Sequence, residues 1–305
     1  MKNILVTVTG IAILIGTLTP LKSNEPYIEI EDIYDTDGVL EEWQYPGKYS
    51  PVNIFDNDVN TVHAENSKGD YMLLRMRFKQ TIECDEIQVL GGVAVNTDLY
   101  QKNNRPKEVH MRLFDTNESL INDKEIYVKK YFLKDTLRYQ NMRFDKAYTV
   151  KNVTFHVLDV YPGTKYNDTC ITELKFFNKG KEIPVNDVEK LKKDYVKWVG
   201  ERLKKFFAMG KFKVEDWLGE AYIQKNGGIR YKIYRIGEMN KVLPYALPTK
   251  YEVKDSRLYM TIEGKRGLVN YFLCNFLPCN YMLIVSIGEY KYKEPVRWRI
   301  MKETP

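Results

Sequence analysis

The sequence has few of the residues on which catalytic and metal centres usually depend. Its 305 residues include 3 histidines and 4 cysteines. It contains no HExxH motif, no nucleophile elbow and no CxxC pair, which excludes the zincin, α/β-hydrolase and zinc-ribbon signatures. A pair of carboxylates that meets only in the folded chain stays open as an alternative. The sequence therefore favours a binding protein over an enzyme, and it predicts no organic cofactor.

Long apolar runs and low-complexity tracts are also missing after the N-terminus. Hydrophobic residues make up 44% of the chain and charged residues 29%, with 18 Gly and 12 Pro. This composition excludes a disordered, collagen-like or coiled-coil protein. The most apolar later stretch, 268–288, is interrupted by asparagines and a proline, so no transmembrane segment is expected beyond the N-terminus. Aromatic residues, at 13%, favour β-structure.

The N-terminus has the pattern of a secretory signal peptide. Lys2 precedes an apolar run from Ile4 to Leu18, which is too short and too rich in threonine for a typical membrane anchor. We expect residues 1–23 to be the signal peptide of an exported, bacterial protein of the periplasm, cell surface or medium. A retained anchor is the alternative.

Export would place the four cysteines in a compartment where disulfides form. Cys274 and Cys279 flank Pro278 closely in sequence and are the first candidates for a bridge. Cys84 and Cys170 either pair with each other or are two buried thiols.

Charge divides the chain into parts of opposite sign. Residues 24–180 contain 20 Lys and Arg against 26 Asp and Glu, whereas residues 181–305 contain 25 against 15. This change predicts two domains with different surfaces. We expect an acidic arm over 24–44, a first domain over 45–180 and a basic second domain over 181–305.

Short strand-like runs separated by turn residues fill the first domain and predict an antiparallel β-sandwich or jelly roll. In the second domain, apolar residues with a 3.6-residue period predict a helix over 187–209, followed by a short helix near 214–220 and an antiparallel sheet. The fold class is therefore mainly β, a sandwich followed by an α+β domain. The expected strands are 71–78, 86–90, 107–114, 149–158 and 171–176, then 221–224, 229–236, 251–253, 258–263, 271–276, 281–287 and 296–301.

The helix over 187–209 has one apolar and one lysine-rich face. A basic helix with exposed aromatic residues can lie on anionic lipid. Packing of the apolar face on a sheet, with the lysines in water, is the favoured interpretation.

Three stretches of the first domain carry a family resemblance: NIFDNDVNTVH over 53–63, NTDLYQKNNRPK over 96–107, and LDVYPGTKYNDTCITE over 158–173. Together they resemble the F5/8 type C, discoidin-like and galactose-binding-like fold. They are most similar to its NADase-type glycan-binding subgroup, which is related to the translocation domain of streptococcal NAD glycohydrolase. The resemblance covers about residues 45–178 and extends to the targeting domain, not to a catalytic one.

The turn that follows residue 53 presents oxygen ligands. The spacing of Asp56, Asp58 and Thr61 can direct three oxygens to one point, as a hard cation such as Ca²⁺ requires. An Asp-rich turn that bonds to its own backbone is the alternative. The resemblance implies a structural Ca²⁺ with further ligands from the backbone carbonyl of Asn53, the backbone carbonyl of Thr172, and Glu173.

The resemblance also implies ligand binding by loops at one end of the sandwich. Tyr rings stack on the apolar face of a sugar, while charged and amide side chains bond its hydroxyls. The alternative is that these residues only hold the two loops together. The candidate glycan-binding residues are Asp98, Tyr100, Lys102, Asn104, Arg105, Tyr161, Lys165, Tyr166 and Asp168.

These observations predict an exported, non-catalytic, lectin-like protein that binds a glycan or a glycosylated surface. The basic second domain would meet an anionic component of the envelope. Nucleic acid is a poor partner for an exported chain. The alternative is an exported enzyme whose second domain is catalytic and whose first domain targets it.

Overall fold

The computed structural model describes residues 26–36, 38–66, 72–116, 125–214, 219–233, 247–276 and 279–300. The signal peptide predicted over residues 1–23 lies outside these ranges, as do the side chains of Cys274 and Cys279. The disulfide between these two cysteines therefore stays a prediction. Within the described ranges, no helix is both long and apolar enough to cross a membrane.

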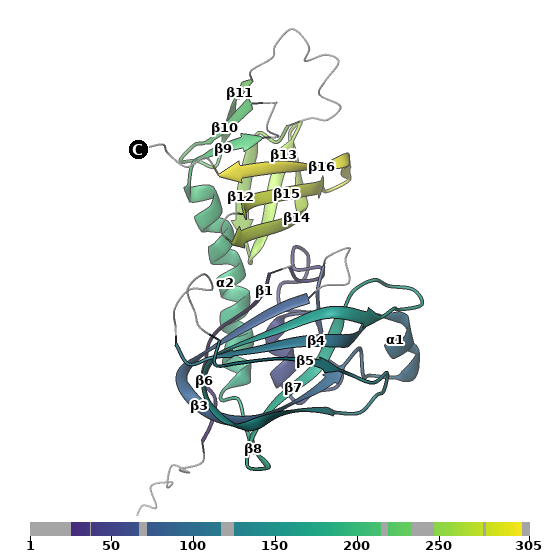
Figure 1. The fold of residues 1–305 in the computed structure, drawn as a ribbon. Coiled ribbons are helices and arrows are strands. Elements are labelled where there is room, and N and C mark those ends of the chain that lie inside the picture. Colours follow the sequence, from purple (N-terminus) through teal and green to yellow (C-terminus); the bar gives the residue numbers. More distant parts are fainter. Residues whose placement is uncertain are drawn as a thin grey trace, which may run out of the picture.

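The first part of the chain forms one eight-stranded sheet that is folded into two layers (Figure 1). Its strand order is β2-β7-β3-β6-β4-β5, with β1 paired to β3 and β8 paired to β7. Two short helices, η1 and α1, interrupt the strands. The elements are β1 (Ile30–Asp35), η1 (Pro51–Phe55), β2 (His63–Ala64), β3 (Met72–Gly91), α1 (Thr97–Lys102), β4 (Arg105–Phe114), β5 (Tyr127–Phe132), β6 (Gln140–Tyr161), β7 (Cys170–Asn178) and β8 (Lys181–Ile183).

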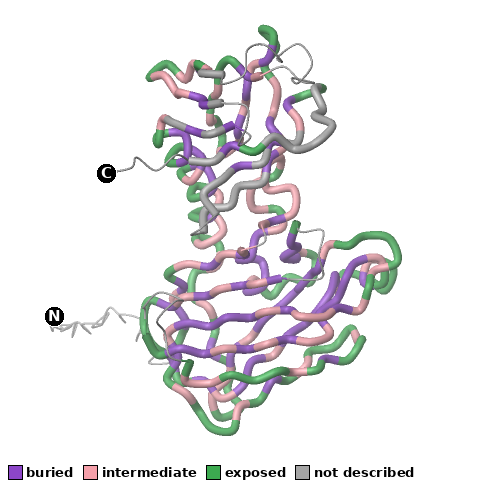
Figure 2. Tube along the Cα trace, turned by 45° about the horizontal axis from the view of Figure 1, so that its top comes forward, coloured by how far each residue is buried: buried purple, intermediate pink, exposed green. Residues whose placement is uncertain are grey.

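Two long strands, β3 and β6, belong to both layers of the sandwich. They pair with each other along most of their length, with breaks in register between Arg77 and Ile82 and between Cys84 and Glu86. The first half of β3 also pairs with β1, and its second half pairs with β7. Buried and more exposed residues alternate along the first half of β3 (Figure 2), so alternate side chains enter the core.

The second part of the chain forms a second antiparallel sheet of eight strands, in the order β11-β10-β9-β16-β15-β14-β13-β12. Its outer strands meet at one end through the bridge between Gly228 and Lys250 and a hydrogen bond from the Ile229 N–H to the Thr249 carbonyl, 2.8 Å long. The sheet is therefore curved toward closure. Its strands are β9 (Lys211–Val214), β10 (Gly219–Ile223), β11 (Ile229–Ile233), β12 (Lys250–Lys254), β13 (Arg257–Ile262), β14 (Lys265–Phe276), β15 (Cys279–Ile287) and β16 (Tyr290–Ile300).

One helix, α2 (Val188–Ala208), connects the two sheets and enters both hydrophobic cores (Figure 1). Tyr195 and Val199 belong to the core of the sandwich. One turn later, Leu203, Phe206 and Phe207 belong to the core of the second sheet. The helix begins after Asp187, whose carboxylate caps it by accepting a hydrogen bond from the Lys190 N–H, with the Asp187 backbone in the left-handed region at φ 50°.

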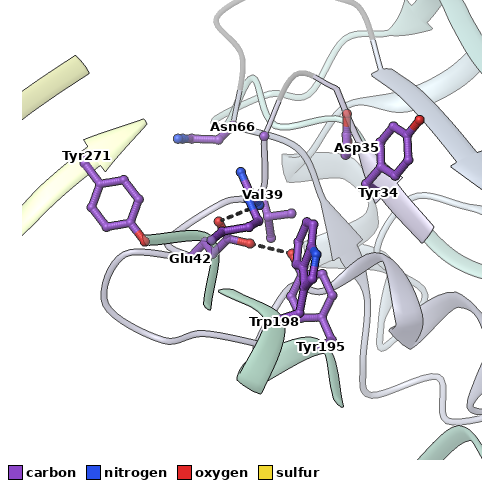
Figure 3. A pocket seen from close by; sticks show the side chains of 10 residues that line it. Tyr34, Asp35, Val39, Glu42, Asn66, Tyr195, Trp198 and Tyr271 are labelled. Atoms are coloured by element: carbon purple, nitrogen blue, oxygen red, sulfur yellow. Dashed lines mark hydrogen bonds and ion pairs between the residues drawn. The ribbon is translucent and has the colours of Figure 1, made fainter. Parts of the chain in front are cut away.

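The two domains also meet around a small polar cavity of about 20 Å³ beside α2 (Figure 3). Glu42 is central there, because its carboxylate accepts a hydrogen bond of 2.5 Å from the Tyr195 hydroxyl and lies 3.8 Å from the Arg202 guanidinium. Tyr271, from β14, lines the same cavity. The nearby Trp43 packs against the core of the second sheet. The segment after β1 therefore contributes to the junction of the two domains.

The predicted fold class is confirmed, although several individual elements differ from the prediction. The runs over 71–78 and 86–90 belong to one strand, β3, and β5 was not predicted. The ends of the short helix predicted near 214–220 lie in strands, since Val214 ends β9 and Gly219 begins β10, and residues 215–218 lie outside the described ranges. Phe212 and Val214 are both buried in the second core, and this two-residue period is that of a strand.

Phe207 tests whether α2 holds the second sheet. Its ring is 1% exposed and stacks on Tyr251 at 4.2 Å between centroids. We expect Phe207→Ala to lower the free energy of unfolding by about 3–5 kcal/mol, because it leaves a cavity between helix and sheet. Urea denaturation followed by tryptophan fluorescence measures the change. The control is Lys204→Ala, on the exposed face of α2, and an equal effect of the two variants would contradict this role.

Candidate functional site

Three loops meet at the end of the sandwich where β4 begins and β6 ends: α1 with the residues after it, the segment 133–139, and the segment 162–169. Asn96 caps α1 by accepting a hydrogen bond of 2.8 Å from the Leu99 N–H. The Tyr166 N–H and the Thr164 N–H donate to the carbonyls of Lys102 and Gln101, at 2.8 and 2.9 Å. The first and third loops are therefore held together by backbone hydrogen bonds.

Arg105 is the centre of these loops and is 7% exposed. Its guanidinium donates to both carboxylate oxygens of Asp135, at 3.0 and 2.9 Å. It also donates to the carbonyls of Asn103 and Pro162, at 2.9 and 3.2 Å. A planar guanidinium with five donors can join several acceptors in this way. Arg105 therefore joins all three loops.

Tyr100 and Asp135 complete this cluster. The Tyr100 ring is 7% exposed, lies 5.1 Å from the Arg105 guanidinium, and its hydroxyl donates to Asp135 at 2.8 Å. Burial raises the pKa of Tyr100 above its usual value, and the hydrogen bond to Asp135 adds to the shift. The hydrogen bond from Arg105 lowers the pKa of Asp135. Tyr100 and Arg105 are thus buried parts of the loop framework.

Asn104 links the first loop to the third. Its amide donates to the Asn167 carbonyl at 2.8 Å, and its side-chain oxygen accepts from the Gly163 N–H at 2.7 Å. A Cβ at position 163 would lie 2.4 Å from the Lys102 carbonyl, so only glycine fits there.

The other predicted glycan-binding residues surround this framework. Asp98, Lys165 and Tyr166 are exposed, and Lys102, Tyr161 and Asp168 are half-buried. Asp98 and Lys102 form an ion pair at 2.6 Å, and the Lys165 ammonium lies 5.0 Å from the Tyr166 ring. The Tyr161 hydroxyl donates to the Leu133 carbonyl, and burial raises the pKa of Asp168. The exposed group offers one aromatic face with charges of both signs nearby.

The sequence analysis missed Asp135 and Phe132. Asp135 lies between β5 and β6 in a segment without a recognisable motif, and only the fold brings it to Arg105. Phe132, the last residue of β5, is 74% exposed. An exposed aromatic residue next to a predicted ligand loop is a signal that the sequence alone does not reveal, since apolar residues are usually buried.

The predicted calcium loop is ordered by its own side chains. Asp56 accepts hydrogen bonds from the Asp58 N–H at 2.9 Å and from the Thr61 hydroxyl at 2.6 Å. Asp58 instead accepts from the backbone and side chain of Asn60, at 3.0 and 2.8 Å. This is the hydrogen-bonding pattern of an Asx turn.

Glu173 lies beside this loop, as the family resemblance implied. Its side chain is 1% exposed. Its carboxylate oxygens lie near the N–H groups of Asn57 and Asp58 but outside normal hydrogen-bonding geometry. Burial raises the pKa of Glu173 to about 7, with a further contribution from Asp56.

The remaining predicted ligands are the backbone carbonyls of Asn53 and Thr172, whose side chains are engaged elsewhere. The Asn53 amide donates to the carbonyls of Lys48 and Val62, and its own carbonyl accepts from the Asp56 N–H. The Thr172 hydroxyl donates to the Gly92 carbonyl. Among the residues that the structure describes, no three His, Cys, Asp or Glu side chains are grouped to hold a metal ion. Asp56 and Asp58 have the hydrogen bonds of a self-bonded turn, while the buried carboxylate oxygens of Glu173 have no hydrogen-bond partner among the described residues.

The histidines and the first two cysteines are structural. His63 is fully buried, with its ring nitrogens 2.9 Å from the Tyr49 carbonyl and 2.8 Å from Asp35. His110 and His156 are register partners on β4 and β6, and burial lowers the pKa of both. Cys84 and Cys170 are buried free thiols.

Residues 33–177, from β1 to β7, match the model of the NAD glycohydrolase translocation F5/8 type C domain. This part of the chain is an F5/8 type C domain. The resemblance predicted over about 45–178 is therefore confirmed. The match to the F5/8 type C domain ends before α2 and the second sheet. The comparison with curated proteins found no match.

Solved structures similar to this chain include three that contain bacterial sugar-binding modules. The chitosan-binding module 1 of a Paenibacillus sp. IK-5 chitosanase/glucanase is 13% identical, with a TM-score of 0.36 over 48% of this chain and 94% of that one. The family 32 module of Clostridium perfringens NanJ, solved with galactose, is 12% identical, with a TM-score of 0.36 over 48% and 93%. The first two such modules of Clostridium perfringens ZmpB are 19% identical, with a TM-score of 0.35 over 51% of this chain and 34% of theirs. This chain thus spans about a third of the ZmpB structure.

Arg105→Lys tests the loop framework of the F5/8 type C domain. Lysine cannot bond Asp135 with two donors and reach the carbonyls at once. We expect a loss of about 1–2 kcal/mol in the free energy of unfolding, moderated because Asp135 is 40% exposed. Amide hydrogen exchange should rise over 97–104 and 162–168. The control is Lys102→Met, which removes only an ion pair to the exposed Asp98. Unchanged amide hydrogen exchange in Arg105→Lys would contradict the conclusion that Arg105 holds these loops together.

The same cluster predicts a response to acid. The pKa of Asp135 is lower in the folded protein than its ordinary value. Its carboxylate therefore stabilises the loops above about pH 4, and this contribution is lost as pH falls through the folded pKa. Asp135→Asn should remove it. We expect hydrogen exchange of the wild-type loops to approach that of the variant as pH falls below 4, after correction for intrinsic exchange rates. A difference that persists at low pH would contradict this linkage.

Proposed function

We propose that this protein is an exported, non-catalytic glycan-binding protein that holds sugar on the loops of its F5/8 type C domain. The observation that carries the proposal is the contrast between a buried Arg105 framework and the exposed residues around it. A ligand surface on fixed loops loses little conformational entropy on binding. The loops of a rigid scaffold are also where binding residues are commonly placed.

The exposed residues have the chemistry for a sugar. Tyr166, 39% exposed, can stack its ring on the apolar face of a pyranose. Lys102 and Lys165 can donate to hydroxyl oxygens, and Asp98 can accept from hydroxyl groups. The existing ion pair of Asp98 and Lys102 keeps these groups in place before a ligand arrives. The buried Tyr100 and Arg105 hold in place the loops that carry this surface.

The proposal of a non-catalytic role rests on the buried state of the usual reactive groups. Both ring nitrogens of His63 are engaged. Burial raises the pKa of Cys84 to about 12 and that of Cys170 well above its usual value, so neither is available as a thiolate nucleophile. The alternative is that the second domain is catalytic, and the experiment below also tests this.

The partner of the second domain is proposed from its charge. Residues 181–305 carry ten more Lys and Arg than Asp and Glu, and exposed lysines such as Lys193, Lys204 and Lys205 line α2. A positive surface attracts anionic partners over distances of about 10 Å at moderate salt. We propose an anionic component of the cell envelope as this partner.

Tyr166→Ala tests the glycan surface. A glycan array that includes galactose and chitosan oligosaccharides first identifies a ligand for the full chain, and titration calorimetry then measures its Kd. We expect Tyr166→Ala to weaken binding at least tenfold, about 1.4 kcal/mol, through loss of the stacked ring. The control is Tyr27→Ala, because Tyr27 is equally exposed at 39% and precedes β1.

Three results would contradict the proposal. Equal binding by the two variants would place the sugar elsewhere on the chain. Release of reducing sugar from the bound ligand, measured over a day, would show that the chain is an enzyme. Absence of any bound glycan would make the loops a scaffold without this ligand.

A further inference from the structure

The acidic turn after η1 meets a lysine from the far end of the sequence. The ammonium of Lys192, in the second turn of α2, lies 2.8 Å from Asp56 Oδ2. The Asp56 side chain is 3% exposed and that of Lys192 is 28% exposed. Lys192 also lies 3.4 Å from Glu189 on its own helix. The contact therefore joins the sandwich to α2 at a site that is largely shielded from water.

We infer that the Lys192 ammonium is the resident cation of this turn and stands where the family resemblance implies a metal ion. Three donors already reach Asp56: the Asp58 N–H, the Thr61 hydroxyl and Lys192. The last two share Oδ2, the oxygen that is directed toward α2. A Ca²⁺ ion at Asp56 and the ammonium of Lys192 therefore exclude each other.

The charge of the Asp56 carboxylate and the attachment of Lys192 to α2 both favour the ammonium over a Ca²⁺ ion at this position. A buried carboxylate that loses its only cation is strongly destabilising, so Asp56 requires a positive partner. Lys192 is attached to a helix that both cores hold in place, so it binds at a high effective concentration. A free Ca²⁺ ion would have to displace it and would find only Asp56 and Glu173 as buried carboxylates there. The turn is thus an attachment point for α2.

Substitution of Lys192 tests whether the cation at Asp56 is the Lys192 ammonium or a Ca²⁺ ion. We expect Lys192→Gln to lower the midpoint of thermal unfolding in EDTA by about 5 °C, because Asp56 loses its partner. The variant should gain Ca²⁺ binding and recover part of its stability in 1 mM CaCl₂. The matched control is Lys193→Gln, the next residue, whose side chain is exposed and should behave as wild type.

The wild-type chain gives an independent test. We expect calorimetric titration with CaCl₂ to show no saturable binding, and the midpoint to be the same in EDTA and in 1 mM CaCl₂. Saturable Ca²⁺ binding by the wild type would overturn the inference even if Lys192→Gln failed to fold. A Lys192→Gln variant that matches Lys193→Gln in both buffers would also overturn it. Either result leaves glycan binding by the loops untouched.

Discussion

Helix α2 contributes side chains to two hydrophobic cores, and this sharing fixes how the two halves of the protein are arranged. A helix repeats every 3.6 residues, so residues four apart point in similar directions. Val199 and Leu203 are four apart, yet they lie in different cores. The boundary between the cores therefore falls within one turn of the helix. Gly200 allows this, because a Cβ there would lie 2.8 Å from the Ser256 hydroxyl in the turn between β12 and β13.

Polar contacts fix α2 to the sandwich on either side of this point. Lys192 meets Asp56 near the start of the helix, and Tyr195 and Arg202 meet Glu42 further along. Hydrophobic contacts tolerate small rotations of a helix, whereas a partly buried ion pair has a narrow geometry. The two acids lie in the segment between β1 and β2. This segment therefore helps to set the orientation of the second sheet.

The sequence allowed the fold class and the F5/8 type C domain to be predicted, but not the internal contacts of the site. Alternation on β4 and the 3.6-residue period of α2 are local signals, and both elements were predicted. The length of β3 was not, because Lys79 and Gln80 at its bend are exposed and look like a turn. Arg105 was named as a ligand residue, while its partner Asp135 is thirty positions away. No local pattern connects the two, and a buried arginine looks the same in sequence as an exposed one. The same limit applies to Lys192, which the sequence pattern does not distinguish from the other lysines of the helix.

The burial of Arg105 has a consequence for how the loops can work. Its hydrogen bonds to Asp135 and to carbonyls of the other loops would be broken if it turned outward to meet a ligand. Such a movement would take this donor from the buried Asn103 carbonyl, at a cost of about 1–3 kcal/mol, and would break the ion pair with the partly exposed Asp135. A ligand can reach the exposed ring of Tyr166 without breaking these hydrogen bonds. In the proposed function, selection among sugars would therefore rest on residues that are already exposed. In Figure 1 these loops lie beside α1, away from α2, so the second domain leaves them open while α2 holds it in place.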